Sequence, residues 1–181
     1  HVLGPTWEQI HGLGPVIPEG GPPWWQGRRA ELEQIAREHG CAYVYDRATF
    51  ERTARQLLAI GGVERVFYAI KANPHPDILR SFAALGLAFE CVSQGECERV
   101  IETIPGIDRQ KILFTPNFAP RSEYEWALEQ GVHLTLDNLY PLRHWPELFR
   151  GRDVLLRIDT GFGRGHHDHV RTAGVHSKFG V

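Results

Sequence analysis

Short apolar runs alternate with stretches of helical periodicity over residues 62–159. The apolar runs are rich in branched and aromatic residues; they are VFYAI from Val66, LAFECV from Leu87, KILFT from Lys111, HLTL from His133 and DVLLRI from Asp153. Helical patterns occupy the segments between them, at 77–85, 94–104, 121–130 and 139–149. Buried strands that alternate with helices indicate a parallel sheet covered by helices, which is an α/β fold.

The spacing of these runs favours a (β/α) barrel. Successive strands begin at intervals of about twenty residues with short loops between the elements, as in (β/α) units. A doubly wound sheet is the alternative. A complete barrel has about eight units and typically about 250 residues, so we expect this chain to form the N-terminal part of a barrel, about five units of the eight.

The residues before this pattern are expected to lead into the barrel. Residues 1–27 are rich in glycine and proline and are predicted to be a linker or arm. The next predicted elements are a helix at 28–39 that ends at Gly40, a strand at 42–45, and a helix at 48–60 with Asp46 as its N-cap. The expected organisation is therefore an arm at 1–27 and a partial barrel domain at 28–181, with barrel units from about residue 62.

Composition excludes some partners and favours a compartment. The net charge of -2 and the 42% hydrophobic content give no reason to expect nucleic acid or a membrane surface as a partner. Three cysteines are an odd number without zinc spacing, which predicts reduced thiols and a cytoplasmic protein. The chain contains no Met and begins with His1, so we expect it to be a piece of a longer protein or a processed product.

Lys71 is the first candidate for chemistry, because it closes the apolar run that begins at Val66. The chain has three lysines, and its other basic residues are arginines. A deprotonated lysine amine can form a Schiff base with a carbonyl, whereas arginine stays charged. The alternative is a lysine whose stem is buried while its ammonium reaches water at the end of a strand.

Polar side chains lie at or just after the C-terminal end of every predicted strand, which is the end of a barrel where reactive groups are found. They are Lys71, Asn73, Glu90, Thr115, Asn117, Asp137, Asn138, Arg157 and Asp159. A lysine, a carboxylate and an arginine at three strand ends could hold an imine, orient it and bind an anion. The alternative is that strand ends are polar simply because they emerge into loops.

Two further motifs are weaker. The glycine-rich stretch 161–165 resembles an anion-binding loop but lacks the lysine and hydroxyl pair of a P-loop, which favours a plain loop. The cluster of His166, His167, Asp168 and His169 matches no zinc spacing. We therefore predict a polar loop there and no metal site.

Five segments carry a resemblance to a known family. They are YAIKANP around Lys71, FECVS around Glu90, ILFTPN before Asn117, LRID around Arg157 and SKFG from Ser177. In order and spacing they resemble the pyridoxal-phosphate decarboxylases with an alanine-racemase-like barrel, over roughly residues 41–181. Within that family the chain is most similar to the diaminopimelate decarboxylases, in particular to the decarboxylase half of proteins fused to an aspartate kinase.

The resemblance implies a cofactor, a reaction and an assembly. Pyridoxal 5'-phosphate would be held by Lys71, with Glu90 and Arg157 near it as positioning and electrostatic groups. The reaction would be decarboxylation of meso-2,6-diaminopimelate to L-lysine, the last step of lysine biosynthesis, in a homodimer. The lysine would be buried near other cations, which makes its amine more reactive.

The resemblance covers only part of the family's pattern. The later strands, with the family's phosphate loop, and the second domain are missing here, so we expect residues 1–181 alone to be inactive. The alternatives are an ornithine or arginine decarboxylase, an amino-acid racemase, a cofactor-independent Schiff-base aldolase, or a non-catalytic remnant that serves as an interaction module.

Overall fold

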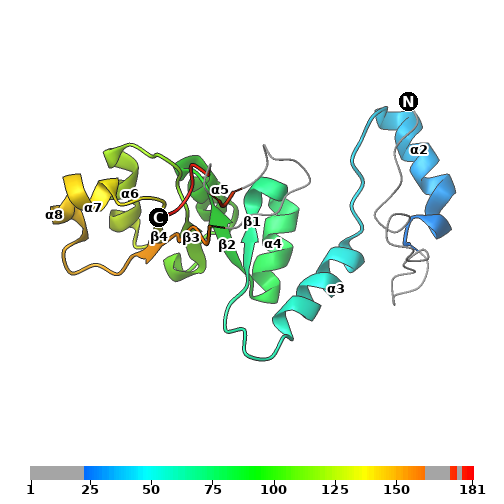
Figure 1. Cartoon of the computed structure of the whole chain (residues 1–181). Coiled ribbons are helices and arrows are strands. Elements are labelled where there is room, and N and C mark those ends of the chain that lie inside the picture. Colours follow the sequence, from blue (N-terminus) through cyan, green and yellow to red (C-terminus); the bar gives the residue numbers. More distant parts are fainter. Residues whose placement is uncertain (1–22, 162–171, 175–176) are drawn as a thin grey trace. The chain divides into compact units, whose positions relative to one another are not determined.

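The computed structural model describes residues 23–161, 172–174 and 177–181. The chain divides into two compact units, His1–Phe50 and Glu51–Val181. Each unit has its own internal contacts and is described by itself (Figure 1). The proposed arm at 1–27 lies almost entirely outside the described residues.

The first unit holds the short 3-10 helix η1 (Gln26–Arg28), the helix α2 (Arg29–His39) and the start of α3 (Arg47–Leu58). The chain leaves α2 at Gly40 with a φ of 69°, a conformation that glycine adopts without strain. An Asp46 carboxylate oxygen accepts hydrogen bonds from the Thr49 N–H at 2.8 Å and from the Thr49 hydroxyl at 2.7 Å. The two predicted helices and the Asp46 cap are therefore confirmed.

The strand predicted at 42–45 is wrong. Residues 42–46 form no regular secondary structure, and Tyr43 is 92% exposed. A strand needs a neighbour to satisfy its backbone N–H and C=O groups. The sheet of the described residues contains β1 to β5 and does not include this segment.

The second unit is built on one parallel sheet. Its strands are β1 (Phe67–Ala69), β2 (Ala88–Cys91), β3 (Ile112–Phe114), β4 (His133–Leu136) and β5 (Leu155–Leu156). The strands lie in sequential order and each pair is parallel. A sheet whose parallel strands follow their sequence order is the arrangement of a (β/α) barrel, whereas a doubly wound sheet reverses its order partway. The predicted α/β barrel-type fold is confirmed.

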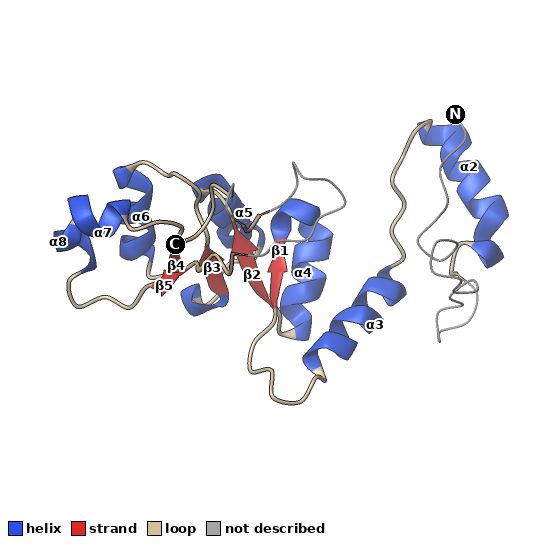
Figure 2. Cartoon of the chain, viewed as in Figure 1, coloured by secondary structure: helices blue, strands red, loops and turns tan. Residues whose placement is uncertain are grey.

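Helices connect successive strands, as Figure 2 shows. They are α4 (Pro76–Leu85), α5 (Gln94–Thr103), α6 (Arg121–Gln130), α7 (Tyr140–His144) and α8 (Pro146–Phe149), with the 3-10 turns η2 (Ile70–Ala72) and η3 (Arg109–Lys111). The helix predicted at 139–149 is instead two short helices that meet at Trp145. Pro146 disfavours the helical conformation of the residue before it, and Trp145 has a φ of -134° and a ψ of 47°.

The core lies between the sheet and the helices α5 and α6. Helix α5 packs against β2 and β3, and α6 packs against β4. The side chains of Phe89, Phe114 and Leu136 are fully buried there. Burial of that kind stabilises a fold by roughly 1.5–3 kcal/mol per large apolar side chain. Strand β5 differs, since its two residues, Leu155 and Leu156, point to opposite faces of the sheet and are 47% and 43% exposed.

No helix in the described part of the chain combines the length and apolar character that a membrane span requires.

Candidate active site

The carboxyl ends of the five strands bring the predicted site residues to one edge of the sheet. Parallel strands in register place their ends side by side, and the pairs Ala69↔Glu90 and Leu136↔Leu156 set the register. Lys71 follows β1 and Arg157 follows β5, while Glu90 lies in β2. The order of the strands therefore places a lysine, a carboxylate and an arginine along the same edge.

Lys71 lies in the 3-10 turn η2, directly after β1. The fully buried Ile70 anchors this turn, and the Tyr68 hydroxyl donates to the Asn73 carbonyl at 3.2 Å. The Lys71 side chain itself is exposed, and within the described residues its ammonium makes no hydrogen bond or ion pair. The prediction of a buried lysine is therefore wrong, because the strand ends at Ala69 and the chain turns outward before Lys71. An accessible amine without a partner is open to a carbonyl compound.

Glu90 is half-buried and tied to the neighbouring strand. Its carboxylate accepts a hydrogen bond from the hydroxyl of Thr115, which follows β3. The Thr115 N–H donates to the Cys91 carbonyl at 2.8 Å, so the backbone of β3 continues to pair with β2 past its assigned end. These contacts fix the carboxylate on the edge of the sheet.

The turn after β2 is held by helix α5. Ser93 caps the helix, because its hydroxyl accepts from the Glu96 N–H at 3.3 Å. The Glu96 carboxylate reaches back and accepts from the Val92 N–H at 2.7 Å. In the usual capping box the glutamate contacts the cap residue itself, whereas here it secures the residue before the cap, two positions after Glu90.

Arg157 is held by three side chains from different parts of the chain. Its Nη1 lies 3.2 Å from an Asp137 carboxylate oxygen and 3.3 Å from the Asn117 amide oxygen. Its guanidinium carbon lies 4.5 Å from the centroid of the Phe179 ring, a cation–π contact. Within the described residues its Nε and Nη2 atoms donate no hydrogen bond. The guanidinium is therefore fixed at one nitrogen and open at the others.

Asp137 is the buried member of this group. Its side chain is 2% exposed, and its second carboxylate oxygen has no hydrogen-bond partner in the described part of the chain. Asp137 also lies near Tyr124, whose hydroxyl has a raised pKa because it is buried and, secondly, because of the negative charge of Asp137.

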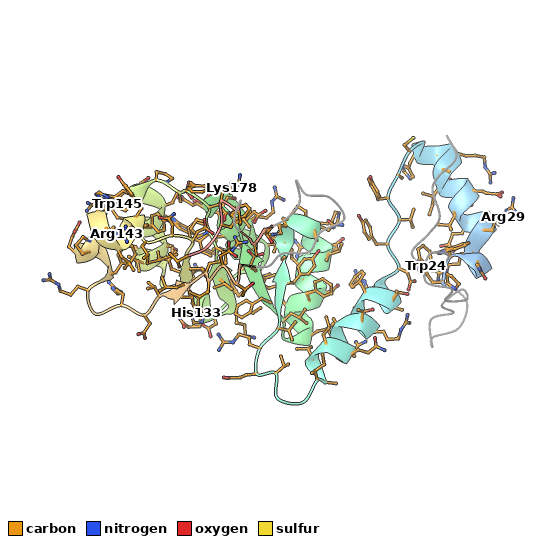
Figure 3. The ribbon with its side chains drawn as sticks, in the orientation of Figure 1. Trp24, Arg29, His133, Arg143, Trp145 and Lys178 are labelled. Carbon is orange, nitrogen blue, oxygen red and sulfur yellow. The ribbon has the colours of Figure 1, made fainter. Side chains whose placement is uncertain are left out.

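The segment at residues 177–181 runs alongside the chain after β5. The Val181 N–H donates to the Arg157 carbonyl, and the Asp159 N–H donates to the Val181 carbonyl, both at 2.9 Å. This is the bonding pattern of neighbouring parallel strands. Lys178, labelled in Figure 3, lies on this segment with its Nζ 5.2 Å from the centroid of the Phe179 ring.

Gly180 and Asp159 allow the segment at 177–181 to lie close to the chain after β5. Gly180 has a φ of 83°, and a Cβ at this position would lie 2.8 Å from the Asp159 nitrogen. The Asp159 carboxylate accepts from the N–H groups of Gly161 at 2.8 Å and Gly174 at 2.9 Å. The two ends of the stretch between Gly161 and Gly174 are thus held at one carboxylate.

Other predicted features have different outcomes. The glycine-rich stretch lies outside the described residues after Gly161, as do His166, His167, Asp168 and His169. Among the residues that the structure describes, no group of three or more histidines, cysteines or carboxylates could hold a metal ion. All three cysteines are free thiols; Cys41 is exposed and Cys91 and Cys97 are buried. A hydrogen bond with Cys97, and then burial, raise the pKa of Cys91.

Sequence reasoning named Asp137 and Asn117 as polar strand-end residues without a role, and it did not connect Phe179 with Arg157. One available signal was the opposite charge of Asp137 and Arg157 at the same position after adjacent strands. The contact with Phe179 has no such signal, because it depends on how the segment at 177–181 returns to the sheet.

The geometry can be compared with known proteins. Residues 47–181 match the family described as "Pyridoxal-dependent decarboxylase, pyridoxal binding domain". Since this match covers most of the chain, the chain belongs to that family.

Within the family, the chain is similar in sequence and structure to individual diaminopimelate decarboxylases. The chain is 32% identical to the diaminopimelate decarboxylase of Methanothermobacter thermautotrophicus, over 84% of this chain and 36% of the relative. It is 34% identical to that of Pseudomonas aeruginosa, over 83% and 38%. The crystal structure of the Helicobacter pylori diaminopimelate decarboxylase complexed with L-lysine has 25% identity and a TM-score of 0.70, over 83% of this chain and 40% of that one. The chain thus spans less than half the length of these relatives.

Proposed function

We propose that the protein containing this chain binds pyridoxal 5'-phosphate through Lys71 and decarboxylates meso-2,6-diaminopimelate to L-lysine. The observation that carries the proposal is the exposed amine of Lys71 at the carboxyl edge of the parallel sheet, which has no polar partner among the described residues. The sequence likeness to diaminopimelate decarboxylases over most of the chain supports the choice of substrate.

The residues present fit a cofactor that has both an aldehyde and anionic oxygens. The Lys71 amine is free to bind an aldehyde. Arg157, on the same edge, has two nitrogens with donors to offer to an oxyanion. When bound, the cofactor supplies the electron sink that decarboxylation of an amino acid requires.

The chain's own residues have three tasks in this proposal. Lys71 gives up a proton from Nζ, because only the neutral amine is a nucleophile. Glu90, held by Thr115, places a fixed negative charge on the edge and so favours cationic groups bound beside it. Arg157 orients anionic groups through a fixed, bidentate donor geometry.

Two parts of the proposal concern the whole protein. We take it to be a cytoplasmic homodimer, as the family resemblance implies, which light scattering and cell fractionation can test. We also take residues 1–181 by themselves to be inactive, since they span less than half of the related enzymes. Expression of residues 1–181 and an assay of carbon dioxide release test this; turnover of roughly 1 per second would contradict it.

The cofactor lysine can be identified directly. The protein is loaded with pyridoxal phosphate, reduced with borohydride and mapped by peptide mass spectrometry. We expect the label on Lys71. Lys111 precedes β3 and so belongs to the opposite edge of the sheet, while Lys178 lies near Phe179. Label on either of these lysines would overturn the assignment.

The substrate is tested separately with a panel of amino acids. We expect carbon dioxide release from meso-diaminopimelate and little from ornithine or arginine. Preference for ornithine or arginine, or racemisation of an amino acid without carbon dioxide release, would replace the proposed substrate and leave the Lys71 assignment in place.

A further inference from the structure

We propose that Asp137 is a positioning residue: it holds Nη1 of Arg157 so that Nε and Nη2 are presented to an oxyanion of the bound cofactor or substrate. The inference rests on the proposed function, and it deepens that function by assigning a role to a residue that does not itself touch the ligand.

The register of the sheet creates the pair. Leu136 pairs with Leu156 in β4 and β5, so the next residues, Asp137 and Arg157, leave the sheet side by side. Their contact joins an Asp137 oxygen to Nη1 at 3.2 Å. The Arg157 N–H also donates to the Leu136 carbonyl at 3.0 Å, which keeps the two backbones together at this position.

Two further contacts fix the plane of the guanidinium. The Asn117 oxygen reaches the same Nη1 atom from the end of β3. The Phe179 ring lies 4.5 Å from the guanidinium carbon and comes from the segment at 177–181. Because the polar contacts use a single nitrogen and the ring contacts the guanidinium carbon, Nε and Nη2 remain as a fork that suits a carboxylate or a phosphate.

Burial separates this pair from the other ion pairs of the described residues. The Asp137 side chain is 2% exposed, whereas that of Asp77, which pairs with Arg80 at 2.9 Å, is 61% exposed. An ion pair with a buried carboxylate seldom adds stability, because the cost of removing the charge from water offsets the attraction. The second Asp137 oxygen, which has no hydrogen-bond partner among the described residues, adds to that cost. Orientation of Arg157 is a role that accounts for a buried carboxylate at this position.

The test compares Asp137→Asn, which removes the charge and keeps the shape, with Asp77→Asn, which removes the charge of an exposed pair. The first readout is the dissociation constant for pyridoxal phosphate in the absence of substrate, from an absorbance titration. We expect Asp137→Asn to weaken binding or to raise KM by about 10- to 100-fold, as loss of an outer support does at other sites. We expect Asp77→Asn to change neither value.

Two arms identify the oxyanion. If Arg157 holds the cofactor phosphate, Asp137→Asn weakens pyridoxal phosphate but leaves pyridoxal, which lacks the phosphate, unchanged. If Arg157 holds an oxygen of the ring or a substrate carboxylate, both aldehydes are affected alike or KM for the amino acid rises with little change in kcat. Either result supports the positioning role, and unchanged cofactor binding together with unchanged KM overturns it.

A double-mutant cycle shows whether Asp137 acts through Arg157. Arg157→Lys keeps the charge but loses the fork, so we expect it to weaken binding as Asp137→Asn does and the double variant to be no weaker than either. Multiplying effects would overturn the proposal. If Asp137→Asn does not fold, Asn117→Ala tests the other hydrogen bond to Nη1 of Arg157. We expect a smaller weakening of cofactor binding in this variant, and unchanged binding would contradict the proposal.

The failure of this inference is distinguishable from failure of the proposed function. Borohydride label on Lys71 in both the wild-type protein and Asp137→Asn, with equal dissociation constants and equal KM values, overturns the role of Asp137 alone. Absence of cofactor binding in the wild-type protein overturns both.

Discussion

Lys71 and Arg157 are basic residues at the same edge of one sheet, yet their surroundings differ. Lys71 is exposed on a 3-10 turn and has no polar partner among the described residues. Arg157 is held by Asp137, Asn117 and Phe179. A group that reacts must keep its nitrogen free, whereas a group that recognises an anion gains from a fixed orientation. The two settings therefore suit the two different roles that we propose for Lys71 and Arg157.

The position of each strand explains the contrast. In the described residues β1 is an outer strand and pairs only with β2, so few side chains surround Lys71. Arg157 follows β5 and lies between the end of β4 and the segment at 177–181, both of which bond to its backbone. The residue types match these settings, since lysine is a flexible point charge and arginine is a planar fork.

The largest expected effect is at the free cation. Lys71→Arg should lower turnover by at least about a thousandfold, because a guanidinium cannot form the covalent link to an aldehyde. The free energy of unfolding should hardly change, since the side chain is exposed and contacts no polar partner in the described part of the chain. Steady-state kinetics and urea unfolding measure both. Lys178→Arg is the matched control, and activity lost equally in that variant would break the comparison.

Replacement of Arg157 should instead lower the free energy of unfolding. Arg157→Ala leaves Asp137 as a buried carboxylate without its counter-ion, which should lower the free energy of unfolding by about 2 kcal/mol. That is less than the roughly 3–5 kcal/mol typical of buried pairs, because the Arg157 side chain is 35% exposed. Urea unfolding of Arg80→Ala, in an exposed pair, should show a loss of less than about 1 kcal/mol. Equal losses in the two variants would contradict the prediction.

Gly180 tests the segment that carries Phe179 to Arg157. Gly180→Ala places a Cβ within 2.8 Å of the Asp159 nitrogen at a φ of 83°, and strain of this kind costs about 1–3 kcal/mol. We expect lower stability in thermal unfolding together with weaker cofactor binding. Gly61→Ala is the control, since no atom lies within 4 Å of its added Cβ. Unchanged stability and unchanged cofactor binding in Gly180→Ala would show that the segment at 177–181 does not hold Arg157.

The smallest expected effect concerns the cysteines, of which Cys41 is exposed and Cys91 and Cys97 are buried. A hydrogen bond with Cys97 and burial raise the pKa of Cys91, so the folded state keeps its proton after the unfolded chain has lost it. Stability should therefore fall as the pH rises above about 8.5, by at most about 1.4 kcal/mol per unit. Urea unfolding at several pH values measures this, and Cys91→Ala should reduce the slope. In the native protein only Cys41 should react quickly with a thiol reagent, and fast reaction of all three would contradict the prediction.

Local sequence pattern determined much of this protein. The five apolar runs became five strands, because nearly continuous apolar stretches bounded by turn residues are typical of the strands of a parallel sheet. Asp46 and Gly40 act where their local hydrogen bonding and backbone freedom predict. The position of Lys71 directly after a strand could also be predicted from the sequence, since it depends on where the apolar run ends. Pro146 carried the signal for a helix break that the periodicity of 139–149 concealed.

Tertiary structure alone decided the rest. Whether residues 42–45 pair, whether Leu155 is covered and whether Lys71 is buried all depend on which segments become neighbours. The contacts with Arg157 come from Asp137 and Asn117, which lie 20 and 40 positions away in the sequence. They also come from the ring of Phe179 in the segment at 177–181. Such contacts arise from the register of distant strands, and hydrophobic periodicity specifies which face of a strand is buried but not which polar groups meet at its end. The sequence therefore indicated which polar residues lie at this edge, and the fold decided which of the two cations is held by other described residues and which is exposed.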